Sequence, residues 1–370
     1  MGKSLSIENI AKNFKDICAV NSISFNVEPG EMFALLGPSG AGKSTTVNLI
    51  AGIEKIDSGD IKINGKSVID VKPQYRDIAM VFESYAIYPN LTVFENMAFP
   101  LKSPMRANKY TKKNIESKIY EIAEILEITE LLQRYPKELS GGQKQRVGLG
   151  RALVRDTDLF LLDEPIAHLD AKLRHTMRSV LKRLQKKYQR TTVLATPDYN
   201  EVVAMADRAA ILDHGEIRQI GTPVDLYNNP DNVIVSRSIG DPPINLLDAE
   251  VVTENNIYFL IGSGFRIQVD KENMPKIFQE GKQKSRNCTI GIRPLDIIIS
   301  RDTKKTKINT EVYIQETLGN RDIISLSVNG YLIKVLTDNE ERYKIGEKIG
   351  IDFHIEKLFY FDKETKNRIR

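Results

Sequence analysis

The segment from Gly37 to Ser44 holds the first residues whose types and spacing fit a defined chemistry. It reads Gly-Pro-Ser-Gly-Ala-Gly-Lys-Ser, which matches the G-x-x-x-x-G-K-[ST] pattern of phosphate-binding loops. An apolar run, 32–36, precedes it and a helix-like stretch, 45–51, follows it. Glycines let the backbone wrap around an anion, and N–H groups at a helix N-terminus point toward phosphate oxygens. We expect Lys43 to neutralise the β- and γ-phosphates and Ser44 to offer its hydroxyl to Mg²⁺. The expected nucleotide contacts here are Gly37, Pro38, Ser39, Gly40, Ala41, Gly42, Lys43, Ser44 and Thr45.

Two carboxylates follow another strongly apolar run, 159–162. Asp163 ends this predicted buried strand and Glu164 comes directly after it. In a chain with a phosphate-binding loop, this arrangement predicts that Asp163 holds Mg²⁺, directly or through water. Glu164 is then placed to polarise the water that attacks the γ-phosphate, which makes it the predicted catalytic residue. We therefore expect ATP and Mg²⁺ as cofactors, although kinases, GTPases, helicases and DNA-repair ATPases all remain open.

The rest of the chain predicts two domains that would position these motifs. The 370 residues suit two domains at about 100 to 200 residues each. Short apolar runs alternate with helical patterns up to about residue 215, which favours an α/β domain with a largely parallel sheet. After about residue 235, short alternating segments between turn residues predict an all-β domain. The clearest predicted strands are Met32–Leu36, Leu159–Leu162, Thr191–Ala195, Thr289–Ile292, Glu311–Ile314 and Ile323–Val328.

The domain boundaries follow from this change of pattern. Residues 1–235 are expected to form the α/β domain and 236–370 the all-β domain. Within the first, 112–132 has apolar residues at helical spacing opposite a charged face. This pattern predicts a helical subdomain, inserted over about 85–155.

Composition limits the classes of partner. Hydrophobic residues make up 41% and charged residues 28%, as in an ordinary globular protein. The net charge of +4 arises from 53 basic and 49 acidic residues spread along the chain, so we expect no nucleic acid partner. No run reaches the ~18 apolar residues of a membrane span, and Met1 to Val20 lacks a signal-peptide pattern. These features predict a cytoplasmic protein, or one peripheral to the cytoplasmic face of the membrane.

The run Leu139-Ser140-Gly141-Gly142-Gln143 excludes most of the nucleotide-binding families left open. Here the sequence resembles the ABC ATPases, in which this motif begins a helix and binds the γ-phosphate of ATP held by the opposing subunit. Small residues, a hydroxyl and a helix N-terminus suit such an approach to phosphate. The resemblance implies nucleotide contacts from Ser140, Gly141, Gly142 and Gln143. Residues 136–151 are expected to continue as one long helix.

The resemblance covers essentially the whole chain and is closest to the maltose-transporter-like ATPases of carbohydrate importers. Residues 81–89 resemble the Q-loop region that meets the permease coupling helix. Phe14 lies where that family has an aromatic residue stacking on adenine, although a lone Phe is more often a core residue. Gly291-Ile292-Arg293-Pro294 and Phe361-Asp362-Lys363-Glu364-Thr365 resemble the family's oligonucleotide-fold-like (TOBE/MOP type) regulatory domain.

Three positions depart from the family pattern. Glu83 replaces the Gln of the Q-loop; its oxygen can still ligate Mg²⁺, but it adds negative charge and cannot donate as an amide does. Pro197 occupies the position of the switch histidine and has no side-chain donor. The D-loop reads Ala-His168-Leu-Asp170 where the family usually has Ser-Asn-Leu-Asp, which implies an altered inter-subunit contact to the attacking water. Loss of one positioned donor typically costs ~10² to 10³ in rate, so these changes predict an impaired cis site.

The resemblance implies an ATP-binding subunit of an importer, coupling Mg-ATP binding and hydrolysis to uptake of a sugar, polyol or sugar-phosphate-like solute. The implied partners are two transmembrane permease subunits, an extracytoplasmic solute-binding protein and a second ABC ATPase. Because the damaged residues act in cis and the intact signature acts in trans, our hypothesis is a non-identical second ATPase. The alternatives are a degenerate site that turns over by another geometry, a scaffold subunit that binds ATP without turnover, and an importer of polyamines or inorganic ions. A soluble ABC ATPase acting on ribosomes or DNA fits the β-rich second domain less well.

Overall fold

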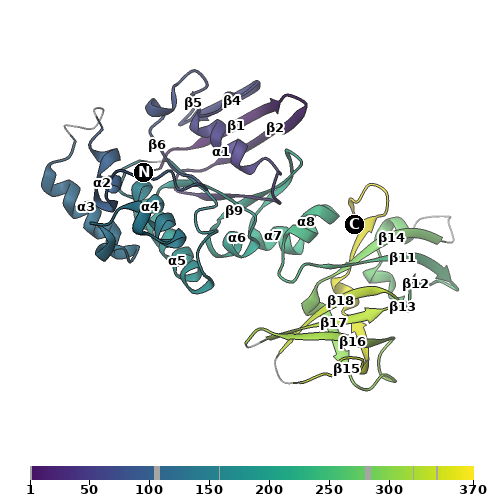
Figure 1. The fold of residues 1–370 in the computed structure, drawn as a ribbon. Helices are drawn as coiled ribbons and strands as arrows, with labels where there is room; N and C mark the ends of the chain where they lie inside the picture. The colour runs from purple at the N-terminus through teal and green to yellow at the C-terminus, as the bar shows by residue number, and fades with distance from the viewer. Residues whose placement is uncertain (1, 104–108, 158, 280–284, 320, 339–340) are drawn as a thin grey trace. The chain divides into compact units, whose positions relative to one another are not determined.

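The chain forms two compact units, one ending at Val224 and the other beginning at Asp225. The computed structural model describes residues 2–103, 109–157, 159–279, 285–319, 321–338 and 341–370 (Figure 1). The division lies earlier in the chain than the boundary predicted after residue 235. No helix in these described ranges is long and apolar enough to cross a membrane.

The first unit is built on a six-stranded, largely parallel sheet. Neighbouring strands are parallel except β10 and β9, which form an antiparallel hairpin. Every residue of the three central strands is buried, which explains why all of them except Asp163, at the end of β7, are apolar or β-branched. In spatial order the strands are β10 (Glu216–Gly221), β9 (Arg208–Asp213), β3 (Met32–Leu36), β8 (Thr191–Thr196), β7 (Leu159–Asp163) and β6 (Ile78–Val81). The predicted α/β class and its three quoted strands are confirmed.

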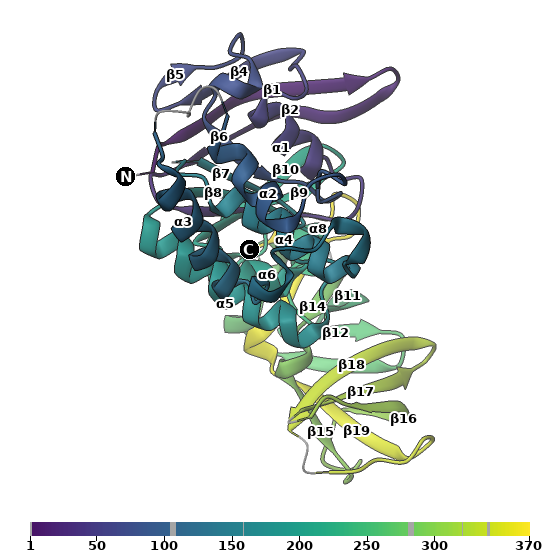
Figure 2. The same ribbon diagram turned by 60° about the vertical axis from the view of Figure 1, so that its left-hand side comes forward.

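A second, antiparallel sheet of four strands forms another layer of this unit, at the top of the view in Figure 2. Its order is β2 (Ile17–Val27), β1 (Leu5–Phe14), β4 (Ser58–Ile63) and β5 (Lys66–Ser67). The buried side chains of α1 (Lys43–Ala51) join one apolar core with both sheets. Phe25 and Phe33 stack across this core with ring centroids 4.9 Å apart.

Three helices, α2, α3 and α4, pack against one another and form the predicted helical subdomain (Figure 1). Their bounds are Val93–Ala98, Lys112–Ile125 and Gly141–Leu153. The predicted helix over 112–132 ends sooner, and a 3-10 turn at Thr129–Leu131 follows. The predicted continuous helix over 136–151 is wrong. Pro136–Glu138 is a 3-10 turn, and Ser140 then caps the start of α4. The unit also contains α5 (Ala171–Tyr188) and α6 (Tyr199–Met205), and α7 (Pro223–Asn228) spans the division between the units.

The second unit consists of two antiparallel sheets around one apolar core, which confirms the predicted all-β domain. One sheet has the order β13 (Phe265–Val269), β12 (Ile257–Gly262), β11 (Asn245–Glu254), β14 (Ser285–Ile292), β20 (Phe359–Asp362) and β21 (Arg368–Ile369). The other has the order β15 (Ile297–Ser300), β19 (Lys348–Phe353), β16 (Ile308–Thr317), β17 (Arg321–Val328) and β18 (Tyr331–Asp338). The unit also contains the short helices α8 (Val233–Ser238) and α9 (Lys276–Gln279).

Arg293, in a motif singled out from the sequence, holds part of this second unit together. Its side chain is 1% exposed and donates to the backbone carbonyls of Ser236 and Tyr227 at 2.9 and 2.8 Å. Asp362, in the other motif, accepts from the backbone N–H of Thr365 at 2.8 Å and closes the turn after β20. Both motifs therefore have a structural role within their own unit.

Candidate functional site

The phosphate-binding loop connects β3 to α1, as the sequence predicted. Gly40 and Gly42 have φ values of 80° and 100°, which residues with a Cβ rarely adopt. A Cβ on Gly42 would meet the carbonyl of Ala19, whereas the space around Gly40 is open. The loop is therefore packed on one side and accessible on the other, as an anion-binding loop must be.

Lys43 is the first residue of α1 and is 4% exposed. Its Nζ donates to the carbonyls of Gly37 and Pro38, both at 2.9 Å. Burial lowers the pKa of Lys43, and the charges of Glu164, Asp163 and Glu83 oppose that shift. Its ammonium group thus lies among the carboxylates that the sequence assigned to the metal and to catalysis.

Ser44 and Asp163 meet directly, although 119 positions separate them. The Ser44 hydroxyl donates to Asp163 Oδ1 at 2.9 Å. Burial raises the pKa of Asp163, the hydrogen bond from Ser44 opposes this, and the charges of Glu164 and Glu83 reinforce it. The two predicted Mg²⁺ ligands are thus already paired at the end of β7.

Glu164 follows β7 in a left-handed conformation, with φ of 46°. Its backbone N–H donates to the Ala195 carbonyl at 2.9 Å. Its own carbonyl accepts from the side-chain amide of Gln145 at 3.3 Å, and the Oε1 atom of Gln145 accepts from the backbone N–H of His168 at 3.1 Å. Gln145, 2% exposed on α4, therefore bridges the catalytic segment and the D-loop. Its position two residues after the signature motif was the only sequence signal for this role.

A cavity of about 590 Å³ gathers residues from four separate segments. Its lining residues are Ser44, Asn48, Phe82, Glu83, Ser84, Tyr85, Asp163 and His168. The structure therefore places the three predicted metal ligands, Ser44, Glu83 and Asp163, on one cavity, together with His168 of the D-loop. The His168 ring meets the Tyr85 ring edge-on, with centroids 5.6 Å apart.

Pro197 is exposed in the turn between β8 and α6. The next residue, Asp198, caps α6 by accepting from the Asn200 N–H at 2.8 Å, and it pairs with Arg178 at 2.7 Å. Glu201 lies behind this turn at 3% exposure, and burial raises its pKa to about 7. The turn is well anchored, but position 197 itself offers no hydrogen-bond donor.

The signature residues lie at the accessible N-terminus of α4. Ser140 and Gly141 are exposed, and Gly142 and Gln143 are partly exposed. Ser140 and Gln143 form a capping box: the Ser140 N–H donates to Gln143 Oε1 at 2.9 Å, and Ser140 Oγ accepts from the Gln143 N–H at 3.3 Å. This arrangement fixes the start of α4 and leaves its face open to a ligand or a partner.

Two further predicted residues lie outside the cavity lining. Asp170 caps α5 by accepting from the Leu173 N–H at 2.9 Å, which gives it a structural role in this chain. Phe14 lies at the end of β1, 41% exposed, with Lys12 Nζ 5.3 Å from its ring centroid. It is thus available for stacking and is not a core residue.

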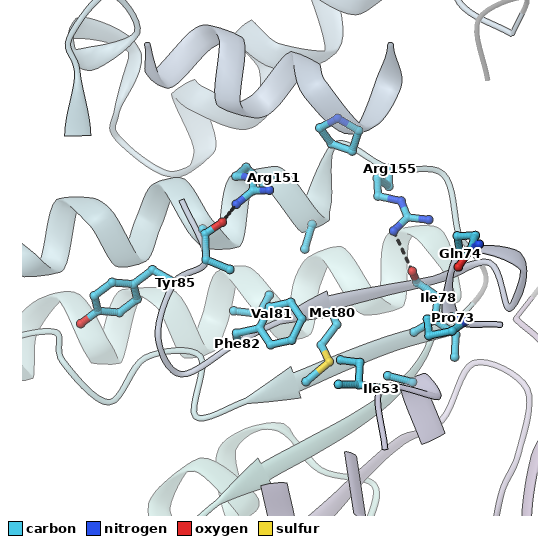
Figure 3. Close-up of a pocket in the computed structure, with 15 residues that line it drawn as sticks. Ile53, Pro73, Gln74, Ile78, Met80, Val81, Phe82, Tyr85, Arg151 and Arg155 are labelled. Atoms are coloured by element: carbon cyan, nitrogen blue, oxygen red, sulfur yellow. Dashed lines mark hydrogen bonds between the residues drawn. The ribbon is translucent and has the colours of Figure 1, made fainter. Parts of the chain in front are cut away.

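A second pocket, of about 330 Å³, lies between β6, the 81–89 segment and α4 (Figure 3). Figure 3 shows Arg151 and Arg155 on one side of it and the apolar side chains of Met80 and Phe82 opposite. Arg155 donates to the Ile78 carbonyl at 2.7 Å, and Arg151 donates to the carbonyl of Ala86. Burial lowers the pKa of Arg151. Tyr85 lines both this pocket and the cavity that contains His168.

The residues present fit a nucleotide with its metal. The desolvated Lys43 ammonium and the open space at Gly40 suit an anion. Within the described ranges, no cluster of three or more His, Cys, Asp or Glu side chains could hold a metal alone. The hydroxyl of Ser44 and the carboxylates of Glu83 and Asp163 on one cavity suit Mg²⁺, which usually binds through one or two carboxylates, water and substrate phosphates.

Comparison with known proteins agrees with this geometry. Residues 20–167 match the ABC transporter family, and residues 240–297 match the MalK OB fold domain. The trehalose/maltose import ATP-binding protein MalK of Thermococcus litoralis is 41% identical, and the alignment covers 98% of each chain. The chain belongs to the ATP-binding subunits of ABC transporters. The members of this family are ATPases. The match to the MalK OB fold domain confirms the predicted oligonucleotide-fold-like character of the second domain.

Other relatives lead to the same family. The sn-glycerol-3-phosphate import ATP-binding protein UgpC of Psychromonas ingrahamii is 38% identical over 99% of this chain and 95% of its own. A solved structure of the ABC cassette MJ0796, dimeric in a post-hydrolysis state with ADP and Pi, is 28% identical with a TM-score of 0.55. It covers 59% of this chain and 98% of its own.

Proposed function

We propose that this chain is the ATP-binding subunit of an ABC importer for a sugar, polyol or sugar-phosphate-like solute, on the cytoplasmic face of the membrane. The observation that carries the proposal is the meeting of Lys43, Ser44 and Asp163 at one site, in a chain whose signature helix has an exposed start. The cargo class is supported by the relatives, whose names specify import of trehalose/maltose and of sn-glycerol-3-phosphate.

Different residues of this chain have separate roles in ATP binding and hydrolysis. Lys43 and the N–H groups of its loop bind the phosphates, and Phe14 stacks on the adenine. Ser44 and Asp163 hold Mg²⁺, with Glu83 as a further oxygen donor on the same cavity. Mg²⁺, when bound, offsets the negative charge that develops on the phosphate oxygens. Glu164 polarises the attacking water, whose oxygen bonds to the γ-phosphorus as the bond to the β-phosphate oxygen breaks.

The pocket in Figure 3 is the proposed docking surface for the permease. Its apolar floor and the two arginines suit a short helix with apolar anchors and carbonyl or acidic groups. The resemblance of residues 81–89 to the Q-loop region supports this occupant. Permease subunits and an extracytoplasmic solute-binding protein complete the importer, as the import functions in the relatives' names imply.

The second ATPase of the assembly is proposed to be a different chain. Pro197 removes a donor from this chain's own site, and Glu83 adds charge to it, whereas Ser140 to Gln143 are intact and accessible. A partner ATPase that retains the histidine would have a complete site of its own. The intact signature motif of this chain would then act on the ATP bound in that site. The dimer of the related MJ0796 cassette supports the pairing of two ABC ATPase chains.

Cellular uptake tests the cargo, and purification tests the partner. Cells lacking the chain should lose uptake of a labelled sugar, polyol or glycerol phosphate, and a Lys43→Ala copy should fail to restore it. A panel of such solutes with no chain-dependent uptake would contradict the cargo class. Affinity purification of the tagged chain should recover a second ABC ATPase with histidine at the position equivalent to 197. An assembly in which this chain is the sole ATPase would contradict the hetero-pair.

Pro197 also favours a second candidate, a scaffold subunit that binds ATP without turnover. Here transport would depend on the partner's site alone. A Glu164→Gln variant separates the two: it should slow transport if this chain hydrolyses ATP and leave transport unchanged if it is a scaffold. ATP binding by the variant serves as the folding control.

A further inference from the structure

The strand that carries Phe14 is held by a carboxylate from a distant segment. Asp57 directly precedes β4, and its Oδ2 atom accepts from the backbone N–H of Asn13 at 2.7 Å. Its Oδ1 atom accepts from the Lys12 ammonium at 3.2 Å, and its own N–H donates to the Ala11 carbonyl at 2.9 Å. The hydrogen bond from Asn13 lowers the pKa of Asp57, so the carboxylate is charged at neutral pH. Asp57 thus binds the three residues that come immediately before Phe14.

Lys12, one of these three residues, lies against the Phe14 ring. Its Nζ atom is 5.3 Å from the ring centroid, within the range of a cation–π contact. The Lys12 side chain is 14% exposed and forms its ion pair with Asp57. One face of the ring is therefore covered, whereas Phe14 as a whole remains 41% exposed. The opposite face is the one that is open to a ligand.

The hairpin of β1 and β2 also lies against the phosphate-binding loop. The pairing of the two strands skips Ala19, which forms a bulge in β2. A Cβ on Gly42 would collide with the Ala19 carbonyl, so the bulge contacts the loop closely. Phe14 pairs with Ile17, two residues from Ala19, which is roughly 7 Å along a strand that rises about 3.3 Å per residue. This spacing suits a nucleotide whose phosphates lie on the loop and whose base reaches Phe14.

Gly215, in the turn between β9 and β10, bonds to both of these segments. Its N–H donates to the Ala41 carbonyl of the phosphate-binding loop at 3.1 Å. Its carbonyl accepts from the N–H of Asn21 on β2 at 2.9 Å. The ring and the phosphate-binding loop are therefore held in a fixed relation within the first unit.

We propose that Asp57 is a positioning residue for the nucleotide base. By holding Lys12 and Asn13, it keeps the Phe14 ring in place with one face covered, and the adenine stacks on the other face. The inference rests on the proposed ATP binding and deepens it, because it assigns a role to a residue that contacts neither the base nor the phosphates. A ring held in its bound orientation before the ligand arrives loses less freedom on binding, so Asp57 contributes to affinity and not to the chemical step.

Tryptophan fluorescence tests the stacking, because the chain contains no tryptophan. A Phe14→Trp variant has a single fluorescent indole, and stacking of adenine on it should quench its emission during titration with Mg-ATP. Inorganic tripolyphosphate with Mg²⁺ has the phosphates but no base, and it should bind without quenching. Binding of Mg-ATP to this variant without any quenching would overturn the proposal.

Isothermal titration calorimetry of the full chain tests the role of Asp57. Asp57→Ala should raise the Kd for Mg-ATP by about 10-fold, within the roughly 5- to 150-fold that stacking of one base contributes, and should change the Kd for Mg-tripolyphosphate by less than about twofold. Asp57→Asn keeps an oxygen acceptor for the Asn13 N–H and should recover part of the affinity for Mg-ATP. Asp60→Asn is the matched control, because Asp60 lies on β4, bonds to the Ser67 hydroxyl at 2.5 Å and should not influence either ligand.

Two results would overturn the role of Asp57. One is an unchanged Kd for Mg-ATP in Asp57→Ala. The other is an equal loss of affinity for Mg-ATP and Mg-tripolyphosphate, which would indicate a general structural role. Failure of the unmodified chain to bind Mg-ATP would instead contradict the proposed function itself, so the two failures are distinguishable.

Discussion

The two sides of the nucleotide cavity differ in how closely they keep the pattern of the family. On the phosphate side, Lys43, Ser44 and Asp163 are buried or part-buried. Lys43 donates to the loop carbonyl of Gly37 and Ser44 donates to Asp163, both at 2.9 Å. On the water side, Glu83, His168 and Pro197 are exposed residues of loops, and all three depart from that pattern. From this contrast we expect the site to bind the nucleotide as the family does and to hydrolyse it at a different rate.

The largest effect is expected on the phosphate side. Lys43→Ala should weaken ATP binding by about 100-fold or more, because truncation of a buried, hydrogen-bonded charge costs roughly 2 to 5 kcal/mol. Titration with a fluorescent ATP analogue measures this. Lys62→Ala, which removes an ion pair with Glu8 on the antiparallel sheet, is the matched control and should bind normally. Equal binding by both variants would show that the phosphate side does not hold the nucleotide.

Ser140→Arg should separate the chain's own site from the one it completes in a partner. The chain's own ATP affinity should stay within about twofold, since Ser140 lies at the exposed start of α4. Hydrolysis by the hetero-pair should fall by about 10²-fold, as expected when a positioned donor to phosphate is lost. Lys137→Ala, an exposed substitution in the preceding turn, is the control. Unaltered hydrolysis by the pair would contradict the trans role of the signature.

Pro197→His tests the water side directly. Restoring a donor should raise single-turnover hydrolysis by the chain alone by about 10-fold, less than the ~10² to 10³ of a fully missing donor because the negative charge of Glu83 remains. ATP affinity should not change. An increase in affinity without an increase in rate would mean that position 197 acts on binding, and the division between the two sides would fail.

The smallest effect concerns the segment behind Pro197. Burial raises the pKa of Glu201 to about 7, so the folded state holds a proton that the unfolded state releases above about pH 4.5. Stability is therefore lost as pH rises, and the free energy of unfolding should fall by about 1 kcal/mol between pH 6 and pH 8 relative to Glu201→Gln. Urea unfolding at both pH values measures the difference. Parallel pH profiles of the two proteins would show that Glu201 is not held neutral by burial.

Local patterns explain what the sequence could predict. The loop from Gly37 to Ser44 and the apolar strands 32–36 and 159–163 each carry their signal in consecutive residues, and the structure places them as expected. The late start of the helix predicted over 136–151 was also encoded, because Ser140 and Gln143 have the spacing of a capping box at a helix N-terminus.

Other features depend on contacts between distant segments. The joining of Glu164 to His168 through Gln145 links α4 to the loop after β7, and no spacing rule predicts it. The place of His168 on the same cavity as Ser44 and Glu83 likewise arises from the order of strands in the parallel sheet.

The most direct test of the account is steady-state Mg-ATPase activity of the purified chain, alone and after co-expression with the second ABC ATPase recovered by affinity purification, with ATP binding measured in parallel. We predict tight binding with slow turnover by the chain alone and rapid turnover by the pair. Rapid turnover by the chain alone would contradict the account, because it would show that Glu83 and Pro197 do not impair the site and that no different partner is needed.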